Sequence, residues 1–567
     1  MMDFLKVAKS ERKPKLVLKG KIFSVFSGEL INGDLAIHNG KIVGIGEYTG
    51  ERTIDVNGII LPGFIDGHIH LESTLLNPVE FAKAVIPHGT TTVFSDPHEI
   101  ANVLGVYGVE FIIKYTKNLP LNFYFLAPSC VPAVKGLETF GAEISSKDIK
   151  KILKFERVVG LAEVMNFPGV INGDPEVIEK LIASKNKVVD GHAPGLTGNQ
   201  LNAYIFPGIY SDHECVTHTE ALEKLRRGMK IMIREGSVAK NLSELIKIVK
   251  DYCSENFILV SDDLLPTDIV KNGHMDYRLK LCIEAGVKPE VAIKMATINT
   301  ARYFGIKDIG ALAPGFKADV VVIDGFDSFK VKMVIKDGNI VWDGNSLKLE
   351  LSPPKLPKKV LSTVKMAEID KKDVEIKAEG KTCRLIELIP NQIVTKASTW
   401  DPPIVNGLAI PDPEQDVAKV VVVDRHRYEK KIGVGFVKGF GIKRGAIASS
   451  VSHDSHNCIC VGVNDADIIV ALRRLKDLQG GFVVVESKKV KAELPLPIAG
   501  LMSNLPLEDV VKRLDSCYNA AKSLGINLEH PFTTLSFLAL PVIPELKITD
   551  YGLVDVNEMR IVNLWIE

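Results

Sequence analysis

The sequence of 567 residues predicts an α/β protein with three parts: a (β/α)8 barrel of the TIM type, a small β-sandwich into which the barrel is inserted, and a C-terminal strand-rich mixed α/β domain. Three observations lead to this fold class. Strand-like runs alternate with helical patterns through the middle of the chain, β-rich segments flank that region, and a proline- and lysine-rich stretch precedes the last third. The length also requires several cores, since single cores rarely exceed about 250–300 residues.

Residues 14–63 read as short strands separated by turns. They include the runs KLVLKGKIFSV, DLAIHNGKIVGIG and TIDVNGIILPG, with Gly and Asn-Gly breaks between alternating apolar and polar residues. A similar β-rich segment returns at 306–350. We therefore expect the two segments to pair into one small β-sandwich that brackets the middle of the chain.

Residues 64–305 repeat a strand followed by a helix. Apolar, β-branched runs such as TTTVFSDPHE, KIMIREGSVA and AYIFPGIYSDHECV end in polar clusters and alternate with helical patterns such as NPVEFAKAVIPHG. Eight such units in about 240 residues match the size of a (β/α)8 barrel, whose active site lies at the C-terminal ends of the strands. The polar clusters are thus expected to meet at one end of the barrel.

A third domain is expected at 360–567, after the linker LSPPKLPKKV. The runs DVAKVVVVDRH, KIGVGFVKGFG and GGFVVVES read as strands, and DADIIVALRRLKDL and PLEDVVKRLDSCYNAAKSLG read as helices. This region is therefore predicted to be strand-rich and mixed α/β.

Composition narrows the classes of protein and partner. Lys+Arg and Asp+Glu both number 70, so the zero net charge argues against nucleic acid or an anionic membrane as partner. Eight scattered cysteines without C-x-x-C favour a reducing, cytoplasmic location. The charged N-terminus MMDFLKVAKSERKPK does not resemble a secretory signal, and no apolar run nears the ~20 residues of a membrane span. We expect a soluble cytoplasmic protein that forms a homo-oligomer.

The strongest functional signal is GFIDGHIHLEST at 63–74. His68 and His70 stand two apart at the end of a strand, so their side chains share one face and can hold one metal ion. An isolated H-x-H pair is as often structural as metal-binding, so the residues at the other strand ends must decide between these two roles. They supply four more candidate ligands, namely Glu163, His192, His213 and Asp262. Four ligands suffice for one tetrahedral ion, whereas six suit two ions that share a bridging carboxylate.

These motifs resemble the amidohydrolase superfamily and, within it, the adenine deaminase family. PGFIDGHIHLEST, the later strand-end histidines, Asp262 and PGFKADVVVID carry the resemblance to the superfamily. The segments GTTTVFSDPHEIANVLG, LAEVMNFPGVINGD, DGHAPGL, SDHE and SVSHDSHN carry the resemblance to the family, which extends from about residue 14 to the C-terminus. It implies hydrolysis of adenine to hypoxanthine and ammonia at a two-metal centre, a step of purine salvage.

The resemblance and the residues together suggest a mechanism. Glu163 stands where many two-metal relatives carry a carboxylated lysine, which counts against the dihydroorotase and hydantoinase branch. We expect two divalent ions per chain, Mn²⁺ first, with Fe²⁺ or Zn²⁺ as alternatives. A metal-activated hydroxide would attack C6 of adenine, and Asp262 would ligate a metal and relay the proton of the attacking water.

The SDPHE segment after the second strand supplies further candidates. His98 is expected to steer protons, and Asp96 and Glu99 are expected to contact the substrate. The alternative for Asp96 is a helix cap before Pro97.

Three more substrate contacts are expected elsewhere. Glu235 and Asp263 follow the seventh and eighth strands, and the alternative for Glu235 is a structural ion pair with Arg234 or another arginine. For His453, in the SVSHDSHN segment, the resemblance implies a loop that helps to enclose the substrate, with a surface turn as the alternative.

Rival functions stay open at this point. The same metals could remove an acetyl group from an amino sugar or open a cyclic amide. A non-catalytic barrel scaffold is the more distant alternative, and such a protein would be expected to have lost several ligands. A cytidine-deaminase type of zinc site is excluded, because it needs P-C-x-x-C and the chain has no C-x-x-C.

Overall fold

Eight strands that follow one another in sequence form the central barrel. In this computed structural model, which describes residues 1–390 and 392–566, five strands form a parallel sheet in the order β5-β6-β7-β8-β9 and three form another in the order β10-β11-β12. The bounds are β5 (Phe64–Ile69), β6 (Thr90–Ser95), β7 (Asn122–Ala127), β8 (Val158–Val164), β9 (Val188–Gly191), β10 (Ser211–Asp212), β11 (Lys230–Arg234) and β12 (Phe257–Val260).

Two junctions bring the parallel sheets together. Ile69 forms a parallel bridge with Asp262, and the Asp262 amide donates to the His68 carbonyl at 2.9 Å. At the other junction the Gly191 amide donates to Ser211 Oγ at 3.1 Å. A Cβ atom on Gly191 would lie 2.1 Å from the Ser211 carbonyl oxygen, so this close approach requires glycine. The two junctions set the strand ends around one mouth.

Helices cover the outside of the barrel, so β6, β11 and β12 are almost wholly buried. The helices are α2 (Pro78–Val85), α3 (His98–Leu104), α4 (Val106–Tyr115), α5 (Ser146–Ile152), α6 (Phe167–Asn172), α7 (Pro175–Ala183), α8 (Gly198–Ile205), α9 (His218–Arg226), α10 (Leu242–Val249), α11 (Pro266–Asn272), α12 (Met275–Glu284), α13 (Pro289–Met295) and α14 (Ile298–Tyr303). In the described part of the chain, none of the helices has the length and apolar character needed to cross a membrane.

The two β-rich segments that flank the barrel share one seven-stranded sheet of order β15-β14-β13-β4-β1-β2-β3. Strand β4 joins them, because it pairs parallel with β1 and antiparallel with β13. The elements are α1 (Met2–Ala8), β1 (Leu16–Ser24), β2 (Glu29–His38), β3 (Lys41–Gly46), β4 (Arg52–Pro62), β13 (Val320–Ile323), β14 (Val331–Lys336) and β15 (Asn339–Trp342).

The C-terminal region is built on a nine-stranded sheet of order β18-β17-β22-β21-β24-β23-β25-β26, with β30 beside β17. Its strands are β17 (Thr382–Leu388), β18 (Thr395–Trp400), β21 (Val417–Val423), β22 (Ile432–Lys438), β23 (Ala446–Ser449), β24 (Cys458–Gly462), β25 (Gly481–Glu486), β26 (Lys489–Pro495) and β30 (Trp565–Ile566). Two small sheets flank it, formed by β16 (Ile376–Lys377), β19 (Ile404–Val405) and β20 (Leu408–Ala409), and by β27 (Leu546–Thr549), β28 (Gly552–Asp555) and β29 (Arg560–Val562). The helices are α15 (Lys358–Leu361), α16 (Lys371–Val374), α17 (Asp465–Leu478), α18 (Leu507–Ser523) and α19 (Pro531–Phe537).

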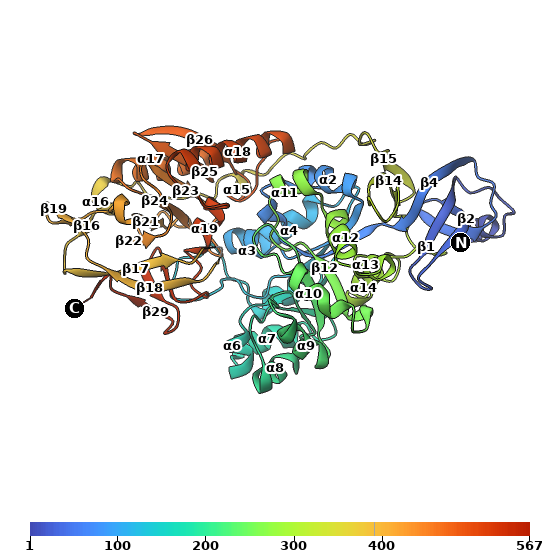
Figure 1. The fold of residues 1–567 in the computed structure, drawn as a ribbon, viewed down its shortest axis with the longest axis horizontal. Helices are drawn as coiled ribbons and strands as arrows, with labels where there is room; N and C mark the ends of the chain where they lie inside the picture. Colours follow the sequence, from blue (N-terminus) through green and yellow to red (C-terminus); the bar gives the residue numbers. More distant parts are fainter. Residues whose placement is uncertain (391, 567) are drawn as a thin grey trace.

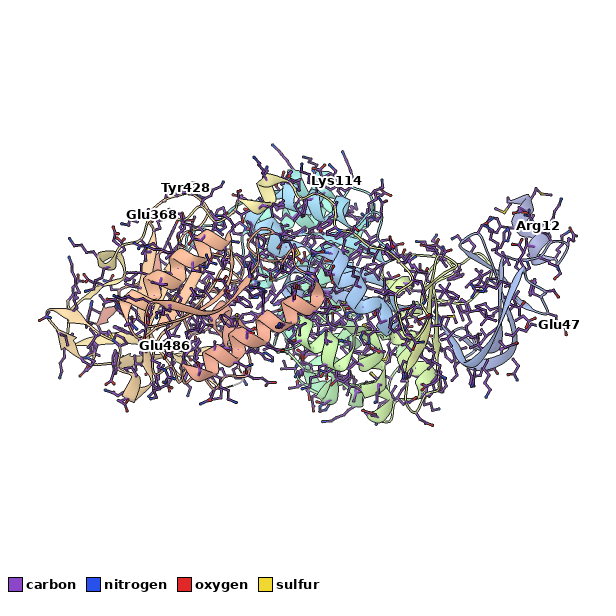
Figure 2. All side chains as sticks on the ribbon, turned by 90° about the horizontal axis from the view of Figure 1, so that it is seen from above. Arg12, Glu47, Lys114, Glu368, Tyr428 and Glu486 are labelled. Carbon is purple, nitrogen blue, oxygen red and sulfur yellow. The ribbon has the colours of Figure 1, made fainter. Side chains whose placement is uncertain are left out.

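The three parts follow one another along an elongated molecule. The N-terminal sheet lies at one end, the barrel in the middle and the strand-rich C-terminal region at the other end (Figure 1). The labelled charged side chains Arg12 and Glu47 lie at the N-terminal end of the molecule (Figure 2). The C-terminal region contacts the barrel through Asn77, whose amide donates to the Ser503 carbonyl at 3.1 Å.

The predicted fold class is confirmed, with two differences in detail. The segments 14–63 and 306–350 pair as predicted, but their strands form one seven-stranded sheet rather than the two sheets of a sandwich. The run AYIFPGIYSDHECV was predicted as a strand, but its first part belongs to α8 and only Ser211–Asp212 form a strand. A short apolar run is equally consistent with a buried helix segment, and Pro207 follows directly after this one.

Candidate metal centre

The six residues predicted as metal ligands lie together at the C-terminal ends of the barrel strands. His68 and Glu163 are part of β5 and β8, and the other four stand one or two residues beyond β5, β9, β10 and β12. All are buried except His192, which is half-buried.

Glu163 lies at the centre of this cluster, with one carboxylate oxygen toward each of two histidine pairs. Its Oε1 is 3.3 Å from His70 Nε2 and 4.0 Å from His68 Nε2. Its Oε2 is 2.7 Å from His192 Nδ1 and 3.2 Å from His213 Nε2. This is the arrangement needed for a carboxylate that bridges two ions.

Asp262 faces the first histidine pair from the opposite side. Its Oδ1 is 3.1 Å from His70 Nε2 and 3.6 Å from His68 Nε2. The residue has a φ of 58°, a left-handed conformation that aspartate adopts more readily than most residues. Its other oxygen, Oδ2, accepts a hydrogen bond from Arg234 Nη1 at 2.8 Å.

Arg234 also binds Glu214, a residue that was not predicted from the sequence. Arg234 Nη2 donates to Glu214 Oε2 at 2.9 Å, and Nη1 donates to Glu214 Oε1. Glu214 Oε1 is also 3.3 Å from His213 Nε2. Glu214 follows His213 directly in the SDHE segment, so its position beside a candidate ligand was the available signal. Arg234 therefore pairs with Glu214 and Asp262 rather than with Glu235.

Whether His68 and His70 fit a metal depends on which of their ring nitrogens carries the proton. His70 Nδ1 is 3.2 Å from the carbonyl oxygen of Asp96, which can only accept, so His70 carries its proton on Nδ1. His68 Nδ1 is 3.1 Å from the buried carboxylate of Asp190. With both Nδ1 atoms engaged, the two Nε2 lone pairs face each other at 3.2 Å and also face carboxylate oxygens. Such a convergence needs positive charge, supplied either by protons on the rings or by a metal ion, and the imidazole and carboxylate groups fit a metal ion.

The charges around the cluster agree with this conclusion. Burial raises the pKa of Glu163, but His192, His213 and His70 outweigh burial and hold that pKa well below its usual value. Burial likewise raises the pKa of Asp262, and Arg234 together with the histidines brings it well below the usual value. Both side chains are therefore carboxylates near neutral pH, as metal ligation requires.

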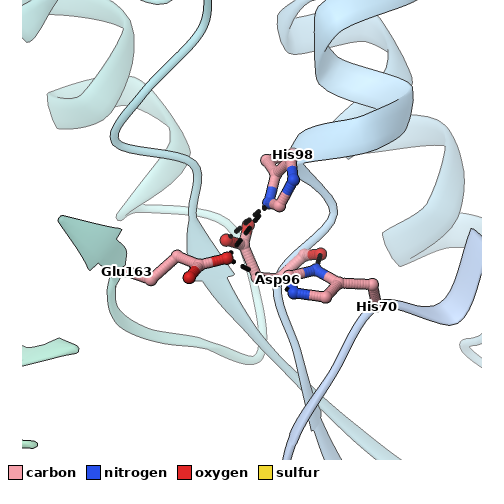
Figure 3. Close-up of side chains that lie close together, drawn as sticks. All are labelled: His70, Asp96, His98 and Glu163. Atoms are coloured by element: carbon pink, nitrogen blue, oxygen red, sulfur yellow. Dashed lines mark hydrogen bonds and ion pairs between the residues drawn. The ribbon is translucent and has the colours of Figure 1, made fainter. Parts of the chain in front are cut away.

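His98 and its neighbours lie directly beside Glu163 (Figure 3). His98 Nδ1 is 3.0 Å from Asp96 Oδ2 and 3.6 Å from Glu163 Oε1, while Nε2 is 3.4 Å from Glu99 Oε1. Within residues 1–390 and 392–566, the buried Oδ1 of Asp96 has no hydrogen-bond partner. Asp96 does not cap α3, which has Pro97 at its N-cap position and no side-chain cap. The alternative role of Asp96 as a helix cap is therefore not observed.

A cavity lies between the barrel mouth and the C-terminal region. Its volume is about 450 Å³ when space open to solvent is included. Asp263 and Ser73 line the barrel side, and Ser73 Oγ donates to Asp263 Oδ1 at 2.5 Å. His453, Phe482 and Phe532 line the opposite side. Two predicted substrate contacts, Asp263 and His453, thus border one cavity, and Asp263 directly follows the candidate ligand Asp262 in the chain.

Glu235 takes part in other contacts. Its Oε2 accepts the N–H of Leu242 at 3.2 Å, at the start of α10. The residue borders a second, polar cavity together with Lys240, Asp268 and Arg278. The structure thus does not bring Glu235 to the cavity that Asp263 and His453 line.

Comparison with known proteins decides the family. Residues 59–341 match the Amidohydrolase family, and residues 392–560 match the Adenine deaminase C-terminal domain. An adenine deaminase of Desulfatibacillum aliphaticivorans is 48% identical over 97% of this chain and 97% of its own length. An adenine deaminase of Kosmotoga olearia is 45% identical over 100% of this chain and 99% of its own length. The chain belongs to the adenine deaminase family.

Membership in the adenine deaminase family confirms the resemblance found in the motifs, and it covers the barrel and the C-terminal region alike. Among solved structures, a β-aspartyl dipeptidase of Fervidobacterium islandicum AW-1 aligns over 59% of this chain and 99% of its own, with 18% identity and a TM-score of 0.45.

Proposed function

We propose that this chain is an adenine deaminase, which hydrolyses adenine to hypoxanthine and ammonia as a step of purine salvage in the cytoplasm. The observation that carries the proposal is Glu163, whose two carboxylate oxygens face two histidine pairs in a member of the adenine deaminase family. The adjoining cavity offers apolar walls and a few polar groups, which suit a small aromatic base.

Two divalent ions are part of the proposal. His68, His70 and Asp262 would hold one, His192 and His213 the other, and Glu163 would bridge both. Imidazole and carboxylate ligands suit Mn²⁺, with Fe²⁺ or Zn²⁺ as alternatives. When bound, such ions lower the pKa of water and supply a nucleophile at neutral pH.

Asp262 is the proposed proton acceptor. Arg234 holds its Oδ2, so Oδ1 is the oxygen fixed toward the ligand cluster. As water attacks C6 of adenine, Asp262 takes the water's proton and passes it to the departing amine. The bond between C6 and the exocyclic nitrogen breaks, ammonia leaves, and the 6-oxo purine remains. We propose that His98, which lies beside Glu163, also takes part in this proton transfer. Asp96 and Glu99 contact its two ring nitrogens.

A substrate comparison tests this proposal. Protein loaded with Mn²⁺ is incubated with adenine or with N-acetylglucosamine 6-phosphate, and hypoxanthine, ammonia and acetate are measured. We expect ammonia and hypoxanthine in equal amounts and no acetate. Hydrolysis of the amino sugar with adenine unchanged would instead support the deacetylase alternative.

The matched variant in this assay is Asp262→Asn, which keeps the size of the side chain. We expect it to keep the fold and to lose nearly all turnover, and substantial activity would contradict the proton-transfer role. The homo-oligomeric state stays a prediction, which light scattering on the same samples can test.

A further inference from the structure

A loop of the C-terminal region reaches the end of the second barrel strand. The loop spans residues 450–457, between β23 and β24, and its residues are mostly buried. His453 Nδ1 is 2.9 Å from Glu99 Oε1, and His456 Nε2 contacts Glu99 Oε2. Two imidazoles from the C-terminal region thus hold one buried carboxylate of the barrel.

His456 is a fixed donor in this arrangement. The Ser452 amide donates to His456 Nδ1 at 3.2 Å, so Nδ1 is the acceptor and the ring proton lies on Nε2, toward Glu99. Burial lowers the pKa of His456 to about 4, which keeps the ring neutral. Because Nε2 carries the proton, it has no lone pair to offer a metal, and the trio of Glu99, His453 and His456 is a hydrogen-bonded unit.

His453 is held differently, with one edge toward the cavity. Its Nδ1 faces Glu99, and its ring stacks on Phe537 with centroids 4.7 Å apart. Among residues 1–390 and 392–566 no group forms a hydrogen bond with its Nε2, and His453 lines the cavity opposite Asp263 and Ser73. Nε2 is therefore the polar atom that His453 can offer to a molecule in the cavity.

The charges around His453 make Nε2 a donor. The groups that face it are Glu99, Asp263, His456 and Asp454, whose Oδ1 is 3.6 Å away. Burial lowers the pKa of His453, but the negative charge of Glu99 and the hydrogen bond to it outweigh burial and raise the pKa to about 9. The ring is thus an imidazolium at neutral pH, and both of its nitrogens carry protons.

We propose that His453 contacts the substrate directly, donating a hydrogen bond from Nε2 to a ring nitrogen of the bound purine. This inference rests on the proposed deaminase function. Purine ring nitrogens are acceptors, and Phe482, Phe532 and Leu264 supply apolar surface for the flat ring. A hydrogen bond from a cation withdraws electron density from the ring and favours attack at C6. The C-terminal region would therefore supply a residue that acts in the reaction.

The test uses the full-length, Mn²⁺-loaded enzyme and the variant His453→Asn. The Asn amide nitrogen can take the place of Nδ1 and keep the bond to Glu99, while the donor at Nε2 is lost. We expect kcat/KM for adenine to fall about ten- to a hundredfold, the usual range for a hydrogen bond to a charged group, with the metal content unchanged. The control is His218→Asn, which alters an exposed histidine 3.3 Å from Glu244 and should leave kcat/KM unchanged.

The pH dependence of kcat/KM supplies a second readout. A purely structural role of His453 would not affect it. Wild-type kcat/KM should decline above about pH 9 as His453 loses its proton, and His453→Asn should lack that decline. A variant within threefold of wild type, with the same decline, would overturn the inference. If His453→Asn does not fold, the wild-type profile decides, and a kcat/KM that stays level to pH 10 counts against the inference. Wild-type protein without adenine deaminase activity would instead overturn the proposed function, and the inference with it.

Discussion

Asp190 controls which nitrogen of His68 faces the other candidate ligands. Both residues are fully buried, and the Asp190 carboxylate lies 3.1 Å from His68 Nδ1. Ser211 donates its hydroxyl to the other carboxylate oxygen, and Tyr303 Oη lies 3.5 Å from that oxygen. A carboxylate held in this way keeps the His68 proton on Nδ1 and leaves the Nε2 lone pair free for an ion.

Replacing Asp190 by Asn should weaken metal binding. The amide removes the negative charge and allows the His68 tautomer to change, and loss of such a partner typically costs about 10- to 100-fold in metal affinity. Competition with a chelator measures the Kd for Mn²⁺. The control is Asp174→Asn, at an exposed helix cap of α7 that asparagine also satisfies. A Kd within twofold of wild type would show that Asp190 does not orient His68.

Single residues show how far the sequence alone could lead. His68, His70, Glu163 and Asp262 were predictable as a group, because polar residues at the C-terminal ends of barrel strands meet at one mouth. Asp190 was not predictable as the partner of His68, because β5 and β9 lie at opposite edges of one sheet and meet only through the curvature of the barrel.

Among the secondary structure elements, β27 contains an unusual residue. All four of its residues are buried, and one of them is Lys547. The Lys547 ammonium donates to the Ile393 carbonyl at 2.8 Å, and burial alone lowers its pKa to about 7. The unfolded chain binds this proton up to a pKa of about 10.4. The fold therefore loses stability as the pH falls from about 10 to 7, and the full loss is present below pH 7.

Replacing Lys547 by Met should stabilise the protein at low pH. Methionine fills similar space without the cost of a buried charge, and only one hydrogen bond is lost. We expect a gain of about 1–3 kcal/mol at pH 6.5 that nearly disappears at pH 10. Urea unfolding at both pH values measures it, with Lys396→Met at an exposed position of β18 as control. Destabilisation at both pH values would contradict this account.

Periodicity predicted most elements, because β-branched runs and amphipathic patterns differ in repeat length. DADIIVALRRLKDL, for instance, coincides with the helix α17. The region of β10 was less predictable, since the apolar Tyr204 and Ile205 before Pro207 are buried as part of the helix α8 rather than of a strand.

At the scale of the whole molecule, the C-terminal region forms one wall of the cavity beside the ligand cluster. Phe482, Phe532 and His453 belong to this wall, while Asp263 and Ser73 belong to the barrel. His456 and Glu99, which hold the two parts together, are 357 residues apart in the chain. The sequence suggested that the SVSHDSHN segment helps to enclose the substrate, but such distant contacts depend on how the domains dock, which no local pattern records.

The most direct test of the proposed two-metal deaminase measures bound metal ions and turnover in the same samples. Protein is stripped of metal and titrated with Mn²⁺, and bound ions per chain are measured together with adenine loss and ammonia release. We expect activity to rise until about two ions per chain are bound and then to stay constant. Two bound ions with adenine unchanged would contradict the substrate, and a chain that binds no Mn²⁺ would contradict the metal centre itself.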